Sequence, residues 1–109
     1  MSIPLPPPIA HYVQLENAGD TATLSACFAP NAMVRDEGRP YEGLAAIAAW
    51  KAETQRQYRH TVTPLDVAHP QGKTVLTATL PGDFPGSPIT VHVDFVLEAG
   101  KILSLEMHA

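Results

Sequence analysis

Residues 11–38 read HYVQLENAGDTATLSACFAPNAMVRDEG, a stretch that predicts two helices leading into a strand. The first helix should run from about Ile9 to Ala18 and end at Gly19, because glycine readily takes the left-handed conformation of a helix C-cap. Asp20 is a suitable N-cap for a second, short helix, which Pro30–Asn31 should end. We therefore expect helices before the first strand of a sheet.

A strand, a turn and a longer helix come next. The strand should run from Ala32 to Asp36, and residues 37–40, EGRP, are typical of a turn. Residues 41–50, YEGLAAIAAW, then begin a third, alanine-rich helix that should extend from about Leu44 to Gln57. Three of its residues recur at helical spacing and define one side, namely Ile47, Trp50 and Thr54.

The remainder of the chain alternates apolar and polar residues and predicts sheet. Four strands are expected, at Thr61–Val67, Thr74–Leu80, Ile89–Leu97 and Ile102–His108. The glycines and prolines of residues 81–88 separate the second of these strands from the third.

The apolar rows of the last two strands predict the register of their hairpin. A three-residue loop, Glu98–Gly100, would place both rows on one face of the sheet, with Gly100 in the left-handed conformation. The other face would be mixed, and its members would be His92, Asp94, Val96, Ile102, Ser104, Glu106 and His108. Such a face could meet solvent or a second copy of the chain.

These elements predict one α+β domain over residues 1–109, with residues 1–8 as an extended, proline-rich lead-in. The sheet, mixed or antiparallel, should curve into a cone over about three helices, which cover its concave apolar face. A chain of 109 residues leaves no room for a second core.

Charge and composition exclude several classes of function. The chain has 7 lysine and arginine residues against 11 aspartate and glutamate residues and no basic patch, so nucleic acid is not an expected partner. No apolar run is long enough to span a membrane. The single cysteine, Cys27, fits a reducing compartment, and the N-terminal residues lack the features of a secretory signal. We therefore expect a cytoplasmic protein.

The stretch from His11 to Trp50 resembles the nuclear transport factor 2-like superfamily, and within it the SnoaL-like and ketosteroid-isomerase-like branch. The shared features are a tyrosine in the first helix, the NAGD turn of residues 17–20, a strand that ends in aspartate, and a glycine before an AAI helix start. The resemblance implies a cystatin-like cone, a pocket for a small apolar molecule and a homodimer through the open face of the sheet.

Two functional positions carry over from this resemblance, and they lie 24 residues apart. Tyr12 matches the tyrosine that donates a hydrogen bond to the substrate carbonyl oxygen, and Asp36 matches the aspartate that acts as general base. The isomerases add an inward-facing aspartate on a late strand. Here Asp94 lies on the face opposite the apolar row, and Val91 or Val93 stands near the family position.

The chemistry of Asp36 and Tyr12 allows two interpretations. Beside Val34 and an apolar helix, Asp36 should be desolvated, which would raise its pKa and make it a better base near neutral pH. It could instead be a turn carboxylate that accepts backbone N–H groups around Gly38. Tyr12 could donate its hydroxyl to a carbonyl or enolate oxygen, or its ring could fill the core. Together the two side chains would permit removal of a proton next to a carbonyl.

Other residues complete the predicted pocket, namely Trp50, Tyr58, His60, Phe28, Val93 and Phe95. An aromatic ring at Trp50 or Tyr58 could stack on a flat ligand, although such rings more often belong to the core. His60 could relay protons or be structural. No metal site is predicted, because the histidine and acidic residues of the late strands lack HxH or HExxH spacing.

The sequence leaves two functions open. The chain could be an isomerase, dehydratase or aldol-type cyclase that needs no cofactor and uses Asp36 as base on a small apolar carbonyl compound. It could instead be a non-catalytic module that binds a hydrophobic ligand or serves mainly as a dimer.

Overall fold

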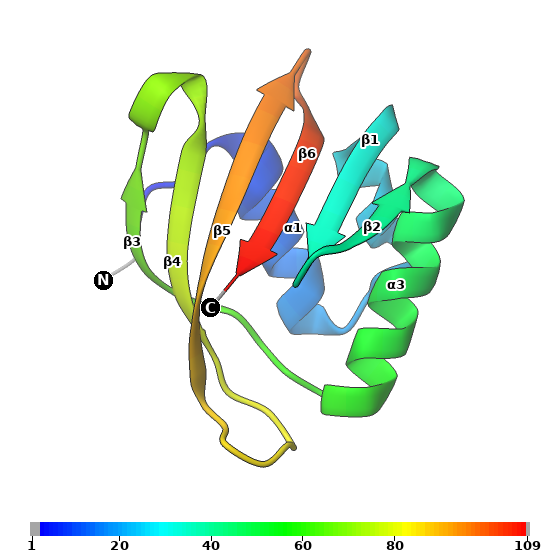
Figure 1. Cartoon of the computed structure of the whole chain (residues 1–109), viewed down its shortest axis with the longest axis vertical. Coiled ribbons are helices and arrows are strands. Elements are labelled where there is room, and N and C mark those ends of the chain that lie inside the picture. The colour runs from blue at the N-terminus through cyan, green and yellow to red at the C-terminus, as the bar shows by residue number, and fades with distance from the viewer. Residues whose placement is uncertain (1–2, 109) are drawn as a thin grey trace.

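The computed structural model describes residues 3–108, and these form a six-stranded sheet packed against helices (Figure 1). The strands are β1 (Phe28–Asp36), β2 (Arg39–Glu42), β3 (Thr63–Ala68), β4 (Thr74–Leu80), β5 (Ile89–Glu98) and β6 (Lys101–His108). Their order in the sheet is β2-β1-β6-β5-β4-β3. Strands β1 and β6 pair in parallel and all other neighbours are antiparallel, so the sheet is mixed.

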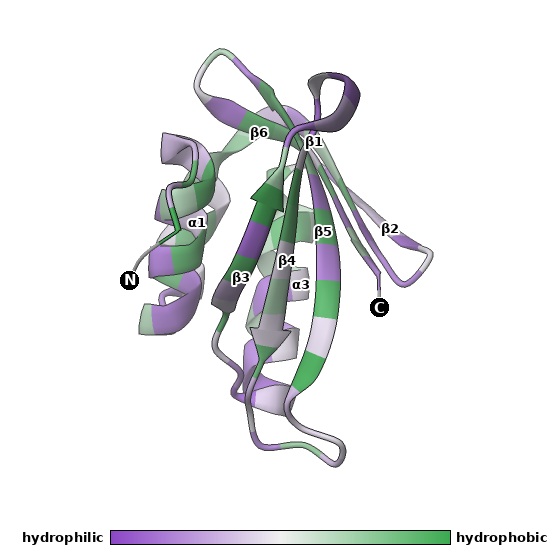
Figure 2. Cartoon of the chain, turned by 90° about the vertical axis from the view of Figure 1, so that its left-hand side faces the viewer, coloured by the Kyte–Doolittle hydropathy of each residue, from purple (hydrophilic) through white to green (hydrophobic). Residues whose placement is uncertain are grey.

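The helices lie on one side of this curved sheet, which confirms the predicted α+β cone. The longer ones are α1 (Pro7–Ala18) and α3 (Gly43–Tyr58), and a short α2 (Thr21–Leu24) with the 3₁₀ turn η1 (Ser25–Cys27) joins α1 to β1. A second 3₁₀ turn, η2 (Pro70–Gly72), joins β3 to β4. Figure 2 shows α1 beside the sheet and α3 behind it. In the described part of the chain no helix is long and apolar enough to cross a membrane.

Helix α1 begins at Pro7, so the extended lead-in is shorter than predicted. Pro7 and Pro8 occupy the first turn, where a helix needs no backbone N–H donor. The helix ends at Gly19 as predicted, with φ of 70° and a hydrogen bond from its N–H to the Glu16 carbonyl at 3.1 Å.

The second helix is shorter, and the first strand longer, than the sequence predicted. Asp20 does cap α2, because its carboxylate accepts a hydrogen bond from the Thr23 N–H at 3.2 Å. Strand β1, however, begins at Phe28 and includes Pro30. The pairing of β1 with β6 is irregular between Phe28 and Met33, and a residue without an N–H is tolerated at such an irregularity.

Strand β2 corrects the prediction of a turn over residues 37–40. Only Glu37 and Gly38 form the turn, with φ of 50° and 84°, and Asp36 pairs with Arg39. Two successive positive φ values are typical of a two-residue hairpin. Pro40 fits because β2 is an edge strand, where its missing N–H removes no pairing. This tight hairpin places Asp36 at the very end of β1.

The β5–β6 hairpin brings its apolar rows together by a route that differs from the prediction. The loop has two residues, Ala99 and Gly100, with φ of 52° and 78°, instead of three. The pairing register shifts between Val96 and Leu97, which places a bulge in β6. The apolar rows therefore still share one face, but Ile102, predicted for the outer face, is fully buried.

The core fills the space between the helices and the inner face of the sheet. Its large buried apolar members include Ile9, Leu24, Phe28, Val34, Ile47, Leu76, Phe95, Ile102 and Leu105. Burial of each such side chain contributes about 1.5–3 kcal/mol. Strands β1 and β6 run in the same direction, and β1 packs against α3.

Candidate functional site

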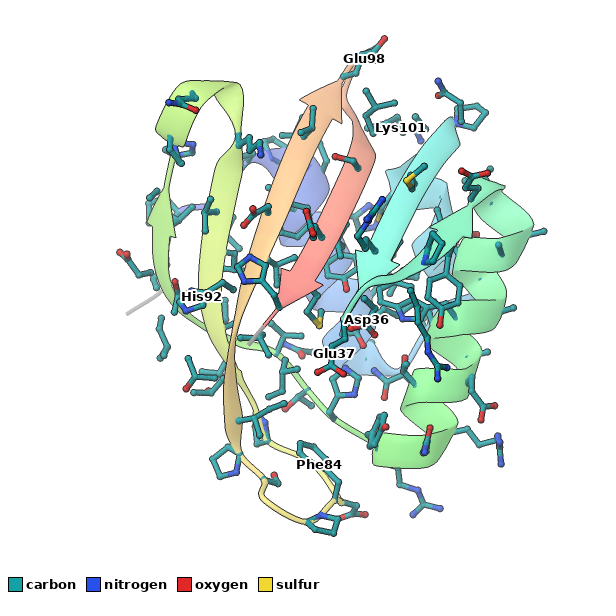
Figure 3. The ribbon with its side chains drawn as sticks, in the orientation of Figure 1. Asp36, Glu37, Phe84, His92, Glu98 and Lys101 are labelled. Atoms are coloured by element: carbon teal, nitrogen blue, oxygen red, sulfur yellow. The ribbon has the colours of Figure 1, made fainter. Side chains whose placement is uncertain are left out.

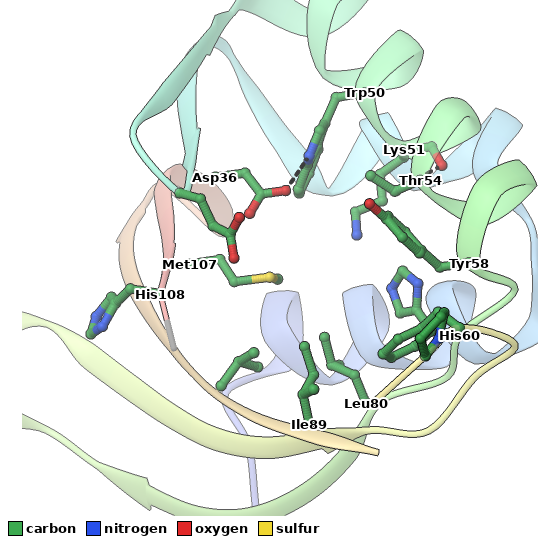
Figure 4. A pocket seen from close by; sticks show the side chains of 14 residues that line it. Asp36, Trp50, Lys51, Thr54, Tyr58, His60, Leu80, Ile89, Met107 and His108 are labelled. Carbon is green, nitrogen blue, oxygen red and sulfur yellow. Dashed lines mark hydrogen bonds between the residues drawn. The ribbon is translucent and has the colours of Figure 1, made fainter. Parts of the chain in front are cut away.

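A cavity of about 260 Å³ opens between α3, the segment before β5 and the ends of β1 and β6 (Figure 4). Its lining residues are Asp36, Glu37, Trp50, Lys51, Thr54, Tyr58, His60, Leu80, Phe84, Pro85, Ile89, Val91, Met107 and His108. Figure 3 shows Asp36 and Glu37 toward the same end of the molecule as Phe84, whereas Glu98 and Lys101 lie at the other end. The cavity wall thus combines charged side chains, among them Asp36 and the buried Lys51, with apolar ones such as Leu80 and Met107.

Asp36 is a half-buried carboxylate in the cavity wall, fixed by one hydrogen bond. The Trp50 indole N–H donates to Asp36 Oδ2 at 2.9 Å (Figure 4). Within residues 3–108, Asp36 Oδ1 has no hydrogen-bond partner, so one oxygen is held and the other is available. The Trp50 ring lies against that of Tyr41, with centroids 5.8 Å apart, and this contact orients the indole.

A short loop covers the cavity opposite Asp36. Phe84 meets the Tyr58 ring edge-on with centroids 5.5 Å apart, and the Asp83 N–H donates to the Tyr58 carbonyl at 2.8 Å. Gly82 permits this approach, because a Cβ atom there would lie 2.9 Å from both the Tyr58 carbonyl oxygen and His60 Cβ. The loop therefore supplies an aromatic wall where α3 ends.

A buried polar cluster lies beside the cavity and centres on Glu16 of α1. Lys51 Nζ lies 2.7 Å from Glu16 Oε2, and His60 Nε2 lies 3.0 Å from Glu16 Oε1. The Gln55 side-chain amide donates to Glu16 Oε1 at 2.6 Å. The side chains of Glu16 and Lys51 are 0% and 1% exposed, so this ion pair is removed from solvent.

The partners of Glu16 keep it ionised in spite of its burial. Burial alone would raise its pKa, but the hydrogen bond from His60 and the charge of Lys51 outweigh this effect and lower the pKa from 4.5 to about 2. The Trp50 ring also positions Lys51, because Lys51 Nζ lies 4.2 Å from the centroid of this ring. The ammonium is therefore fixed by a carboxylate on one side and an indole on the other.

The pKa of Glu16 predicts a loss of stability in acid. Because the pKa is lower in the folded than in the unfolded chain, the stabilisation is complete above pH 4.5 and disappears as pH falls toward about 2. The lowering corresponds to about 3 kcal/mol of the free energy of unfolding. Urea unfolding at pH values from 7 to 2 should show this decline, and a flat profile over that interval would contradict the pairing of Glu16.

Tyr12 lies in the core behind the cavity wall. Its ring meets Phe28 and Phe95 edge-on, with centroids 6.0 Å and 5.8 Å apart. Burial raises the pKa of Tyr12 well above its ordinary value, and the charge of Glu16 adds to this shift. Tyr12 is not a lining residue, so the structure does not bring it into the same cavity as Asp36.

The predicted site residues thus fall into two groups. The cavity wall contains Asp36, Trp50, Tyr58 and His60, whereas Tyr12, Phe28, Val93 and Phe95 belong to the core. The position of each residue along its strand or helix determines whether its side chain faces the cavity or the core. Val91 lines the cavity, and Val93 lies two residues further along β5, toward the interior.

Sequence reasoning missed Lys51 and Glu16, although a signal for both was present. Lys51 follows Ile47 by four residues and so lies on the apolar side of α3. Glu16 follows Tyr12 by four residues on the buried side of α1. A charged residue on the apolar side of each of two helices indicates a buried pair, because an isolated buried charge is very costly.

A second, open hollow lies on the other side of Trp50. It is lined by Asp36, Glu37, Arg39, Tyr41, Ala46, Ala49, Trp50, Glu53, Thr54, Gln57 and Tyr58. Asp36 and Trp50 line both spaces, so the Asp36–Trp50 hydrogen bond lies at the boundary between them.

The outer face of the sheet carries a separate polar group of residues. The rings of His92 and His108 are 5.8 Å apart, His108 Nε2 lies 3.4 Å from Asp94 Oδ1, and Thr77 Oγ1 lies 3.1 Å from His92 Nδ1. Among residues 3–108, no group of three or more histidine, cysteine or acidic side chains is placed to bind a metal ion.

Comparison with known proteins identifies a family and supports the fold. Residues 9–105 match the family model of the SnoaL-like domain. A candidate polyketide cyclase from Sinorhizobium meliloti is 34% identical to this chain, with a TM-score of 0.90, and the match covers 95% of each chain. No curated protein matches the chain.

More distant structures share the fold alone. A hypothetical protein with a ketosteroid isomerase-like fold from Catenulispora acidiphila, in complex with trimethylamine, is 18% identical with a TM-score of 0.85, over 97% of this chain and 87% of that one. A candidate polyketide cyclase from Pseudomonas putida is 19% identical with a TM-score of 0.82, over 99% and 92%. These likenesses confirm the predicted fold.

Proposed function

The chain belongs to the SnoaL-like domain family, and we propose that its cavity binds a small carbonyl compound from which Asp36, as general base, removes a proton next to the carbonyl. The C–H electron pair then enters the carbonyl system as an enolate, and Asp36 becomes protonated. Return of the proton from Asp36 to another carbon gives an isomerase. Its transfer to a departing β-hydroxyl, which leaves as water, gives a dehydratase. Attack of the enolate on a second carbonyl carbon, whose oxygen then takes the proton from Asp36, gives an aldol-type cyclase.

The orientation of the Asp36 carboxylate carries this proposal. Trp50 fixes one oxygen at 2.9 Å, and the other has no partner within the described chain, so the base is oriented before a ligand arrives. Leu80, Ile89 and Met107 are among the apolar residues that line the cavity. A mainly apolar compound would fit these side chains.

The size of the cavity limits the ligand. A volume of about 260 Å³ suits a compound of one or two rings better than a large polycyclic one. The candidate polyketide cyclase from Sinorhizobium meliloti, at 34% identity, supports the aldol-type reaction among the three. The proposed substrate class is therefore a small, enolisable ketone or diketone.

Proton exchange gives the most direct test. Small ketones and 1,3-diketones in D₂O would be followed by NMR for loss of the α-proton signal, and a β,γ-unsaturated cyclohexenone by absorbance of the conjugated product. Exchange catalysed by the wild type and not by Asp36→Asn would support the proposal. Equal rates in the wild type and in Asp36→Asn would remove Asp36 from the mechanism.

A non-catalytic binding module is the second candidate, and one observation favours it. At the late-strand position where the isomerases have a second acid, the chain has Val91 in the cavity wall and Val93 in the core. Ligands that bind the wild type and Asp36→Asn with equal affinity, together with no exchange for any compound, would favour this function.

The Trp50→Phe variant should separate positioning of the base from binding. Phenylalanine keeps a ring beside Lys51 but removes the N–H that holds Asp36 Oδ2. We expect kcat to fall about tenfold, the effect of one hydrogen bond to a charged group, with KM changed far less. Steady-state kinetics would measure both parameters. A rise in KM with unchanged kcat would contradict this role for Trp50.

We also propose that the chain forms a homodimer in the cytoplasm. The sheet face opposite the helices includes His92, Asp94 and Val96, all of which are partly buried in the single chain. Light scattering at micromolar concentration should give twice the chain mass of 11.7 kDa. A monomer under these conditions would rule out a stable dimer.

A further inference from the structure

We propose that Lys51 binds the oxygen of the ligand, so that the cavity takes planar, conjugated oxyanions of the enolate or phenolate type. This inference deepens the proposed function and rests on it for the origin of the enolate. It gives to Lys51 of α3 the contact with the ligand oxygen that the sequence and the resemblance predict for Tyr12.

The first support is the unmet hydrogen-bonding capacity of a buried ammonium. Lys51 Nζ has three N–H donors, and its side chain is 1% exposed. Within residues 3–108, Glu16 Oε2 at 2.7 Å is its only oxygen partner. Its other close contacts are the faces of Trp50 and Tyr12, at 4.2 Å and 5.5 Å from the ring centroids. Since Lys51 lines the cavity, an oxygen in the cavity could meet the remaining donors.

The second support is that the two carboxylate oxygens of Glu16 have different partners. Its Oε1 accepts from Gln55 at 2.6 Å and lies 3.0 Å from His60 Nε2, so Oε2 alone is left for Lys51. The carboxylate is a counter-ion for Lys51 on one side only and does not surround the ammonium. A fixed charge of this kind stabilises negative charge that develops on a ligand, because it needs no reorganisation when that charge appears.

The third support is the position of Lys51 relative to the base. Asp36 and Lys51 extend into the cavity from different sides, and Leu80 and Ile89 line it below them in this view (Figure 4). A ligand between them would present its C–H bond to Asp36 and its oxygen to Lys51. The other donors in the wall fit this role less well, because Tyr58 is 37% exposed and His60 Nε2 already meets Glu16.

The probe for this inference is 4-nitrophenol, whose phenol and phenolate forms absorb at different wavelengths. We expect the wild type to bind the phenolate in preference to the phenol, seen as increased phenolate absorbance when protein is added at fixed pH. Lys51→Met alone would leave Glu16 buried without its cation, and this variant could fail to fold. The matched variant is therefore Lys51→Met with Glu16→Gln, which removes both charges together.

The double variant should bind phenolate about 10- to 100-fold more weakly, the range expected for one charge-assisted hydrogen bond, with little change for the neutral phenol. Lys73→Met removes the same charge from an exposed position and serves as control. Circular dichroism would confirm that each variant is folded. Equal phenolate affinity in the wild type and the double variant, or a wild type that binds neither form, would overturn the assignment of Lys51.

The Asp36→Asn variant separates this inference from the proposed function. It should keep the preference for phenolate, because Lys51 and Glu16 are intact. Phenolate preference without proton exchange for any ketone would leave the Lys51 site standing and refute the reaction. Wild-type exchange rates in the folded double variant would refute the role of Lys51 and leave Asp36 as base.

Discussion

The Asp36→Asn variant is expected to lose proton-transfer activity by about 10²- to 10⁴-fold, the contribution of a positioned general base. Asparagine has nearly the same shape, and its amide oxygen can still accept the Trp50 N–H that now meets Asp36 Oδ2 at 2.9 Å. The cavity should therefore bind ligands with affinities close to those of the wild type. Exchange rates by NMR, and dissociation constants from titration, would measure the two effects separately.

The neighbouring carboxylate provides a comparison for this prediction. Glu37→Gln removes the same charge one residue away, on an exposed turn residue that also borders the cavity mouth. Its activity should exceed that of Asp36→Asn by a wide margin, because only Asp36 is oriented by Trp50. A similar loss in both variants would mean that negative charge at the mouth matters more than a base at Asp36.

Local features of the sequence were sufficient to predict most elements of the fold. Gly19 ends α1 and Asp20 caps α2, and both depend only on neighbouring residues. The strand Thr74–Leu80 was predicted with its observed limits because its alternation is regular. The prediction is wrong at two prolines, one expected to end a helix and the other expected to lie in a turn. Pro30 and Pro40 lie instead at an irregularity and on an edge strand, which only the strand order reveals.

For the last hairpin, the sequence predicts the buried face of each strand correctly and the length of the loop wrongly. The apolar pattern correctly predicts that both rows are buried on one face. The prediction of a three-residue loop to achieve this is wrong. The structure uses a two-residue turn and a bulge in β6 instead, and Ile102 becomes part of the core. The apolar pattern determines which faces must be buried, whereas several backbone geometries can satisfy it.

In the candidate site, too, one part can be predicted from the local sequence and another depends on contacts between distant residues. Asp36 at the end of β1 was predicted from a short stretch of sequence. Lys51 and Glu16 are 35 residues apart, and their contact depends on how α1 and α3 pack on the sheet. The charges on apolar helix sides could have indicated that a buried pair exists. They could not have shown that it borders the cavity.

Replacement of Glu16 by glutamine is expected to lower the free energy of unfolding by about 3–5 kcal/mol, because the buried Lys51 ammonium would lose its counter-ion. Urea unfolding at pH 7 would measure the loss. The combination with Lys51→Met should recover most of it, since a buried ion pair replaced by neutral groups of similar volume costs little. Full additivity of the two substitutions would contradict the pairing. Recovery in the double variant would show that the pair adds little net stability, because the cost of taking both charges out of water offsets their attraction.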